Sequence, residues 1–163
     1  MSDTIEIRRF READAADLAR CLVDEQNALR VFDPRLPEGT TMVDAYLLQI
    51  MAACVEYDGV ILVGTISDQV VGFLALLKRF GRSGADDAPG THALVVDVAV
   101  RPAWQGRGVG SALMRQAEAE ARAAGATEMR LSALYKNQRA IDLYQRLGYV
   151  PYDMTLAKRL DAD

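Results

Sequence analysis

A glycine-rich turn that leads into a helix is the part of this sequence best suited to bind a ligand. It consists of Gln105, Gly106, Arg107, Gly108, Val109, Gly110 and Ser111. The first N–H groups of a helix have no partners within it and carry partial positive charge, so they attract anions. Glycine has no Cβ, which lets phosphate oxygens approach these groups closely. The segment therefore predicts a phosphate-binding turn, with a purely structural tight loop as the alternative.

Two common nucleotide-binding patterns fit this turn poorly. A dinucleotide fingerprint needs its third glycine where this chain has Ser111, and it follows its strand directly, whereas residues 101–105 intervene here. The acidic residue expected further on would be Glu128, which lies at the start of its strand rather than at the end. The sequence contains no GKS or GKT of a Walker motif. A nucleotide-binding oxidoreductase domain is therefore the less favoured interpretation.

A longer stretch around the turn resembles a known family. The segment Val98–Gly110 is similar to motif A of the GNAT N-acetyltransferases, with its Q-x-x-G-x-G pattern complete at Gln105, Gly108 and Gly110. The segment Asn137–Tyr149 resembles motif B, in which an Asn, an Ala, a Tyr and a Leu-Gly-aromatic ending hold these relative places. Two motifs at the right separation make the resemblance to this family more specific than one motif would.

The resemblance implies acetyl-CoA as a cosubstrate and no metal. It assigns the pyrophosphate to the glycine-rich turn and the pantetheine arm to the edge of the preceding strand. The predicted cofactor-binding residues are Val98, Ala99, Val100, Gln105, Gly106, Arg107, Gly108, Val109, Gly110, Ser111, Asn137, Ala140 and Tyr144. An extended arm can pair with an exposed strand edge, so we expect a gap between the strand ending at Val100 and the strand beginning at Thr127. The family opens that gap with a bulge.

Acetyl transfer to an amine needs a neutral amine, a polarised carbonyl and a proton for the departing thiolate. Tyr144 resembles the family's general acid; a tyrosine that only packs in the core is the alternative. Several family members have a Glu base where this chain has Ser132, which cannot take a proton from an ammonium. Asp97, beside the expected thioester, is the predicted base, with a structural carboxylate as the alternative. A water chain to Glu25 or Glu56 is the other route.

Hydrophobic periodicity predicts the elements that position these residues. Strands are expected at Ile5–Arg9, Val60–Ile66, Val70–Leu77, Ala93–Val100, Thr127–Ala133 and about Asp153–Lys158, and helices from Asp14, from a Thr41 and Asp44 capping box, at Gly108–Ala124 and at Gln138–Leu147. The second helix is expected to bury Met51 among other apolar residues. Asn137 is the expected N-cap of the last helix. The stretch Gly81–Gly90 is expected to be a loop.

These elements predict a single domain spanning residues 1–163. A hairpin followed by a strand–helix–strand segment indicates a sheet with antiparallel and parallel pairs. The resemblance completes this prediction as an α/β (mixed α+β) GNAT-like fold. We expect a central, mostly antiparallel sheet of about six to seven strands, flanked by about four helices.

Composition limits the partners of the chain. A net charge of −4 argues against nucleic acid as a partner. Apolar runs such as Val70–Leu77 are too short to span a membrane, and the acidic start Met1–Asp3 does not fit a signal peptide, so we expect a cytoplasmic protein. His92 is the only histidine in the sequence, so a histidine-based metal site would have just this one imidazole ligand. The two cysteines, Cys21 and Cys54, are expected to pack in the core.

The sequence predicts an N-acetyltransferase that moves an acetyl group from acetyl-CoA to a primary amine. The acceptor, a small molecule or a peptide, is left open, and so is a homodimer as the assembly. Because Ser132 stands where several family members have a Glu base, a second interpretation stays open. In this interpretation the chain is a non-catalytic acyl-CoA sensor or interaction module with the same fold.

Overall fold

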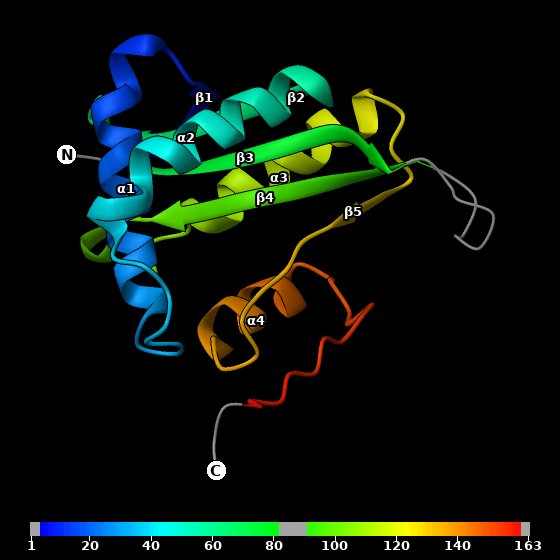
Figure 1. Cartoon of the computed structure of the whole chain (residues 1–163). Helices are drawn as coiled ribbons and strands as arrows, with labels where there is room; N and C mark the ends of the chain where they lie inside the picture. Colours follow the sequence, from blue (N-terminus) through cyan, green and yellow to red (C-terminus); the bar gives the residue numbers. More distant parts are fainter. Residues whose placement is uncertain (1–3, 82–90, 161–163) are drawn as a thin grey trace.

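The computed structural model describes residues 4–81 and 91–160. Nearly all of the loop predicted at Gly81–Gly90 lies outside these described residues. Figure 1 shows the arrangement of the chain, with helices on both sides of one twisted sheet.

The described part of the chain forms one sheet of five strands in the order β1-β2-β3-β4-β5. The strands are β1 (Glu6–Arg9), β2 (Gly59–Ile66), β3 (Gln69–Gly81), β4 (His92–Val100) and β5 (Glu128–Arg130). The first four pair antiparallel, and β4 pairs parallel with β5. The predicted mixed, mostly antiparallel sheet is confirmed.

The predicted number of strands was too high. The strand expected at Asp153–Lys158 is an irregular, exposed segment, in which the side chain of Leu156 is 86% exposed. Its alternating apolar residues suggested a strand, but alternation gives a strand only where a neighbouring edge supplies hydrogen bonds. The strand expected at Thr127–Ala133 is shorter too, because the chain leaves β4 after Arg130.

The described residues also form four α-helices. They are α1 (Ala15–Leu29), which follows a short 3-10 turn at Glu12–Asp14, α2 (Gly39–Glu56), α3 (Val109–Ala123) and α4 (Gln138–Arg146). Helices α1 and α2 cover one face of the sheet and α3 covers the other, while α4 lies beyond β4, beside the segment that leaves β5 (Figure 1). Within the described residues, none of these helices has the length and apolar character needed to cross a membrane.

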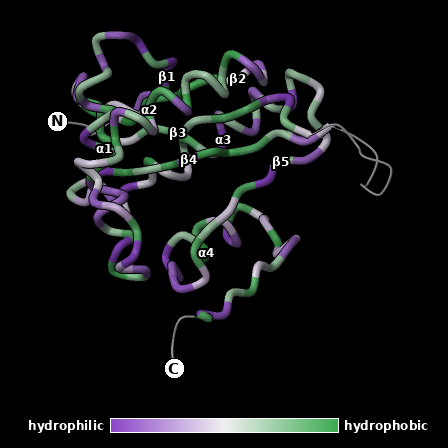
Figure 2. The backbone as a smooth tube through the Cα atoms, in the orientation of Figure 1, coloured by the Kyte–Doolittle hydropathy of each residue, from purple (hydrophilic) through white to green (hydrophobic). Residues whose placement is uncertain are grey.

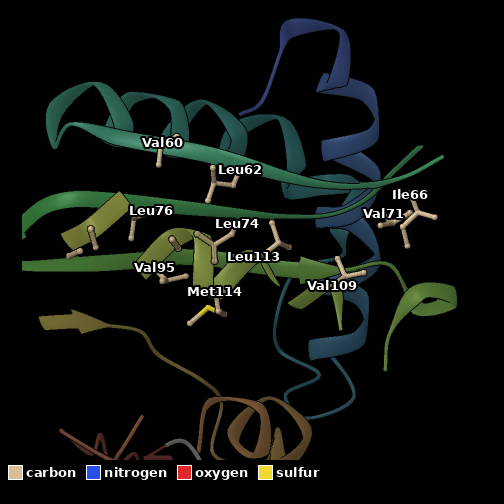
Figure 3. Close-up of a cluster of buried hydrophobic side chains, with 13 residues drawn as sticks. Val60, Leu62, Ile66, Val71, Leu74, Leu76, Val95, Val109, Leu113 and Met114 are labelled. Atoms are coloured by element: carbon tan, nitrogen blue, oxygen red, sulfur yellow. The ribbon is translucent and has the colours of Figure 1, made fainter. Parts of the chain in front are cut away.

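The sheet separates two hydrophobic cores. On one side, Leu18, Cys21 and Leu22 of α1 pack with Phe73 of β3, and Cys54 lies at the edge of this cluster. On the other side, Leu113 and Met114 of α3 pack against residues of β2, β3 and β4 (Figure 3). Strands β2 to β4 are accordingly the most continuously hydrophobic part of the chain (Figure 2). The predicted core packing is confirmed for Cys21, whereas Cys54 is only partly buried against the core.

The start of α2 differs from its prediction. The helix begins at Gly39, before the expected Thr41 and Asp44 capping box, and the Thr41 hydroxyl donates to the Glu38 carbonyl (2.8 Å) instead. A Cβ at Gly39 would lie 2.7 Å from the Val23 Cα, so glycine allows α2 to begin directly against α1. The inward position expected for Met51 is wrong, because this side chain is 37% exposed.

Candidate active site

The glycine-rich turn leads into α3 as the sequence predicted. Gly106 and Gly108 have φ angles of +78° and +91°, a region that L-residues rarely adopt. Gly108 is the N-cap of α3, and no side chain caps the first N–H groups of the helix. A Cβ at Gly106 would meet no heavy atom within 4 Å, so this side of the turn is open. The turn therefore presents uncapped helix donors to an anion.

The other residues of the turn fix it to the protein. Val109 is 1% exposed and anchors the first turn of α3 in the core, and Ser111, in the same turn, is partly buried. A Cβ at Gly110 would lie 3.2 Å from Leu143 Cδ2, so this glycine lets α4 pack closely against α3. The exposed Arg107 guanidinium lies over the Trp104 ring, 4.9 Å from its centroid.

Gln105 connects the end of β4 to the start of α4. Its Nε2 donates to the Val100 carbonyl (2.8 Å), and its Oε1 accepts from Arg139 Nη1 (2.5 Å). The predicted N-cap of α4 is confirmed, because Asn137 Oδ1 accepts from the Ala140 N–H (3.3 Å). The two motifs identified in the sequence are thus joined directly, through an arginine that the sequence analysis did not single out.

The expected gap beside β4 is present. The parallel pairing of β4 with β5 covers only His92–Leu94, and Val95–Val100 have no partner from β5. Along this stretch Val98 and Val100 pack toward α3, and Ala99 packs toward α1 and α2. The free edge ends at Val100, and a 3-10 turn at Pro102–Trp104 connects it to the glycine-rich turn.

A β-bulge determines which way Asp97 points. The register of β3 with β4 pairs Ala75 with Asp97 but Leu76 with Val95, which leaves Val96 as the extra residue. Val95 packs on the α3 side of the sheet and Val96 on the other side. Strict alternation would return Asp97 to the α3 side, whereas the bulge turns it toward α1 and α2. The position of Asp97, the predicted base, therefore depends on this β-bulge.

Three polar side chains from three elements meet at this point. The side chains of Glu25 on α1 and Asp97 on β4 are hydrogen-bonded to one another, and Tyr46 on α2 also hydrogen-bonds to Asp97. Burial, the charge of Asp97 and their hydrogen bond raise the pKa of Glu25 well above its ordinary value. Burial also raises the pKa of Asp97, although bonds from Glu25, Tyr46 and the Val98 N–H oppose this rise.

Tyr144 lies on α4 near this group. Burial, followed by the charges of Glu25 and Asp97, raises the pKa of Tyr144 to about 12. Its ring packs edge-on against that of Tyr149 with 6.2 Å between centroids. The Tyr149 hydroxyl instead donates to Glu118 Oε1 on α3 (3.1 Å). Tyr144 is therefore a protonated phenol at neutral pH, close enough to the two carboxyl groups to respond to their charge.

The structure brings together most of the residues that the sequence analysis named. Glu25 reaches Asp97 directly, without the water chain that the sequence analysis considered. Glu56 lies apart, exposed at the end of α2, where it hydrogen-bonds to Tyr57. Ser132 is exposed in the segment after β5. Sequence reasoning missed Tyr46, whose signal was a polar-tipped aromatic between the inward positions Val43 and Ile50 of one helix.

Comparisons with known proteins identify one family. The family model described as "Acetyltransferase (GNAT) family" matches residues 23–149. Thialysine N-epsilon-acetyltransferase of Bos taurus is 36% identical over 59 residues, an alignment that spans 36% of this chain and 35% of that protein. The chain thus matches about a third of the length of this curated relative.

Solved structures share the fold over nearly the whole chain. A Bacillus halodurans protein superposes with a TM-score of 0.82 at 18% identity, covering 95% of this chain and 99% of that one. AAC(6')-Iy, in complex with the bisubstrate analogue CoA-S-monomethyl-acetylneamine, gives a TM-score of 0.65 at 17% identity, with 98% and 99% covered. The family model matches well over half of this chain, and the matched residues include the glycine-rich turn, Asp97 and Tyr144. This chain therefore belongs to the GNAT acetyltransferase family.

Proposed function

We propose that this protein transfers the acetyl group of acetyl-CoA to a primary amine, with Asp97 as the base and Tyr144 as the acid. Membership of an acetyltransferase family supports acyl transfer. The observation that carries the finer proposal is the free edge of β4 from Asp97 to Val100, together with the uncapped donors of α3 that follow the 3-10 turn at Pro102–Trp104. An extended cosubstrate would fit this arrangement with its thioester near Asp97 and its phosphates at the donors of α3.

The residues present fit acetyl-CoA. The open, uncapped turn at Gly106 and Gly108 suits a pyrophosphate, because glycines leave its N–H groups accessible. Val98–Val100 pair with β3 but not with β5, so the edge of β4 that faces away from β3 suits the amides of the pantetheine arm, which can add to a sheet edge as a strand does. The N-terminus of α4, formed by Asn137 and Ala140, completes the predicted binding surface.

Two proton transfers are assigned to named side chains. When bound, acetyl-CoA supplies the thioester whose carbonyl carbon the amine attacks. The Asp97 carboxylate takes a proton from the acceptor's ammonium and so frees the nitrogen lone pair. Tyr144 donates a hydrogen bond from its hydroxyl to the departing sulfur. A phenol is a weaker acid than a thiol, whose ordinary pKa is about 8.5, so the proton of Tyr144 moves to sulfur only as the carbon–sulfur bond breaks. The acceptor nitrogen then loses its second proton as the neutral amide forms, and this proton restores the hydroxyl of Tyr144.

The acceptor is proposed only as a class. The names of two similar proteins refer to thialysine and to an acetylneamine analogue, which share amino groups as the reactive feature. A carboxyl pair near the free strand edge favours an acceptor that arrives as an ammonium ion. Small amines and lysine-like side chains both meet this requirement.

A panel of amines separates catalysis from the sensor alternative. Purified protein is incubated with acetyl-CoA and amino acids, polyamines, aminoglycosides or lysine peptides, and the release of CoA thiol is followed. Release that depends on an amine, together with an acetylated product in the mass spectrum, supports the enzyme. Binding of acetyl-CoA without release in the presence of any amine would favour the acyl-CoA sensor.

Gly108→Ala is expected to weaken binding of CoA, because a Cβ at φ +91° strains the turn that presents the helix donors. The strain itself costs about 1–2 kcal/mol of folding stability. Gly125→Ala at the other end of α3 is the matched control, since its φ is +84° and its Cβ would also have room. Both variants lose similar stability in urea, but only Gly108→Ala raises the calorimetric Kd for CoA. Equal affinities in the two variants would contradict the anion site.

A further inference from the structure

We propose that Glu25, Tyr46 and Asp97 act as one unit, in which Glu25 holds a proton and Tyr46 fixes Asp97 as the group that accepts the proton of the incoming ammonium. This inference rests on the proposed acetyl transfer and adds two residues, from α1 and α2, to its site. Glu25 and Tyr46 are positioning residues here, because they act through Asp97.

Glu25 is a carboxyl group on the buried face of its helix. It follows Cys21 and Leu22 of α1 by one helical turn, and these two residues are 1% and 2% exposed. This spacing directs Glu25 toward the sheet, where it meets Asp97. Ionised carboxylates only accept hydrogen bonds, so two carboxyl groups bonded to one another must share at least one proton. The pair therefore carries at most one negative charge while this bond exists.

The surrounding hydrogen bonds decide which partner keeps the proton. Asp97 receives bonds from Glu25, from the Tyr46 hydroxyl and from the Val98 N–H, and each of these favours its ionised form. On Glu25, burial, the charge of Asp97 and their hydrogen bond all favour the protonated form. Tyr46 can serve as a constant donor, because burial and the nearby carboxyl groups raise its pKa far above neutral.

The elements packed around Asp97 supply the following groups. Helix α1 contributes Glu25, α2 contributes Tyr46 and α4 contributes Tyr144, which responds to the charge of both carboxyl groups. On β3, the residue opposite Asp97 is the apolar Ala75, which is fully buried. The three polar neighbours are neutral when Glu25 and both tyrosines are protonated. Asp97 is then the single charged member of the group.

This arrangement gives a balanced proton transfer. An N–H bond of the acceptor's ammonium breaks, its electron pair stays on nitrogen, and a new O–H bond forms on the Asp97 carboxylate. Both carboxyl groups are then neutral, so no unpaired charge stays buried beside the acyl group. The neutral amine keeps the lone pair that it needs for attack on the thioester.

Tyr46→Phe tests the positioning role through the pH dependence of kcat/KM. Removing the hydroxyl takes a donor from the Asp97 carboxylate, which raises the pKa of Asp97 and moves the acidic limb to higher pH. A hydrogen bond to a charged group is worth enough to lower kcat/KM roughly tenfold at a fixed pH on that limb. At the plateau, where Asp97 is ionised in both proteins, the loss is expected to stay below about threefold.

Tyr57→Phe is the matched control. It makes the same change just beyond the end of α2, where the Tyr57 ring contacts Phe80 and its hydroxyl bonds to Glu56. Its pH profile is expected to overlay that of the wild type. A Tyr46→Phe profile with an unmoved acidic limb, or with a uniform loss at every pH, would overturn the positioning role of Tyr46.

The proton on Glu25 has a readout that does not depend on activity. At neutral pH, a protonated carboxyl group gives an infrared carbonyl band that ionised carboxylates lack, and we expect this band to disappear in Glu25→Gln. A spectrum in which Glu25→Gln removes no such band overturns the shared proton. If the wild-type protein acetylates no amine, the proposed function fails instead, while the infrared measurement still tests the protonated pair.

Discussion

Tyr144→Phe is expected to lower kcat by roughly 10²-fold while leaving the Kd for acetyl-CoA within about twofold of the wild-type value. The substitution keeps the ring that packs against Tyr149 and removes only the hydroxyl that would face the departing sulfur. Because the pKa of Tyr144 is raised to about 12, the wild-type phenol keeps its proton throughout the neutral range. Steady-state kinetics and calorimetry of the two proteins measure the two effects separately.

Tyr149→Phe provides the comparison for this experiment. Its ring is the partner of Tyr144 in the aromatic pair, but its hydroxyl bonds to Glu118 on α3 rather than facing the carboxyl pair. Losing that bond is expected to cost about 1 kcal/mol of stability and to leave kcat unchanged. Equal turnover in Tyr144→Phe and wild type would remove Tyr144 from the reaction and leave it as a packing residue.

Asp97→Asn is expected to lower kcat/KM by about 10²- to 10⁴-fold, because an amide cannot take the proton of the ammonium. It should also abolish the acidic limb of the pH profile. Asp97 must be ionised to act, so kcat/KM of the wild type falls as pH drops through the pKa of Asp97. Burial raises that pKa, so the limb lies at higher pH than an exposed aspartate would give.

Asp44→Asn is the control for the change in charge. Asp44 is exposed on α2, close in sequence to Tyr46, and its replacement removes the same negative charge without touching the carboxyl pair. Its pH profile should retain the acidic limb, and its kcat/KM should equal that of the wild type. If Asp97→Asn also retained an unaltered limb, another group would have to be the base.

The motifs made the proposed cofactor-binding half of the site predictable from sequence. Glycines at 106 and 108 are required by positive φ angles, and Asn137 caps α4 through a bond to Ala140, so local chemistry alone determines these features. The order of strands and helices followed equally from periodicity. Such features depend on neighbours in sequence, which is why they could be inferred before any contact was known.

The proposed catalytic half depends on contacts that the sequence does not encode locally. The run from Ala93 to Val100 is almost continuously apolar, so nothing in its pattern marks Val96 as the bulged residue that turns Asp97 toward α1. The meeting of Glu25, Tyr46 and Asp97 needs two helices and a strand from separate parts of the chain. The prediction of a sixth strand failed for the related reason that its pairing edge cannot be read from alternation.

The bulge links the fold to the proposed chemistry. It lies in the pairing of β3 with β4, opposite the stretch where β4 has separated from β5. One local irregularity therefore accompanies both the free edge proposed for the pantetheine arm and the orientation of the proposed base. We expect substitutions that restore regular pairing of β3 with β4 at the bulge to change both the free edge and the orientation of Asp97.

Calorimetric titration of the purified protein with CoA and acetyl-CoA tests the central claim most directly. The uncapped donors of α3 and the free edge of β4 predict saturable binding of both ligands at a single site per chain, weakened by Gly108→Ala. Absence of binding by either ligand to the folded wild-type protein would contradict the account of the site and the acetyl transfer derived from it.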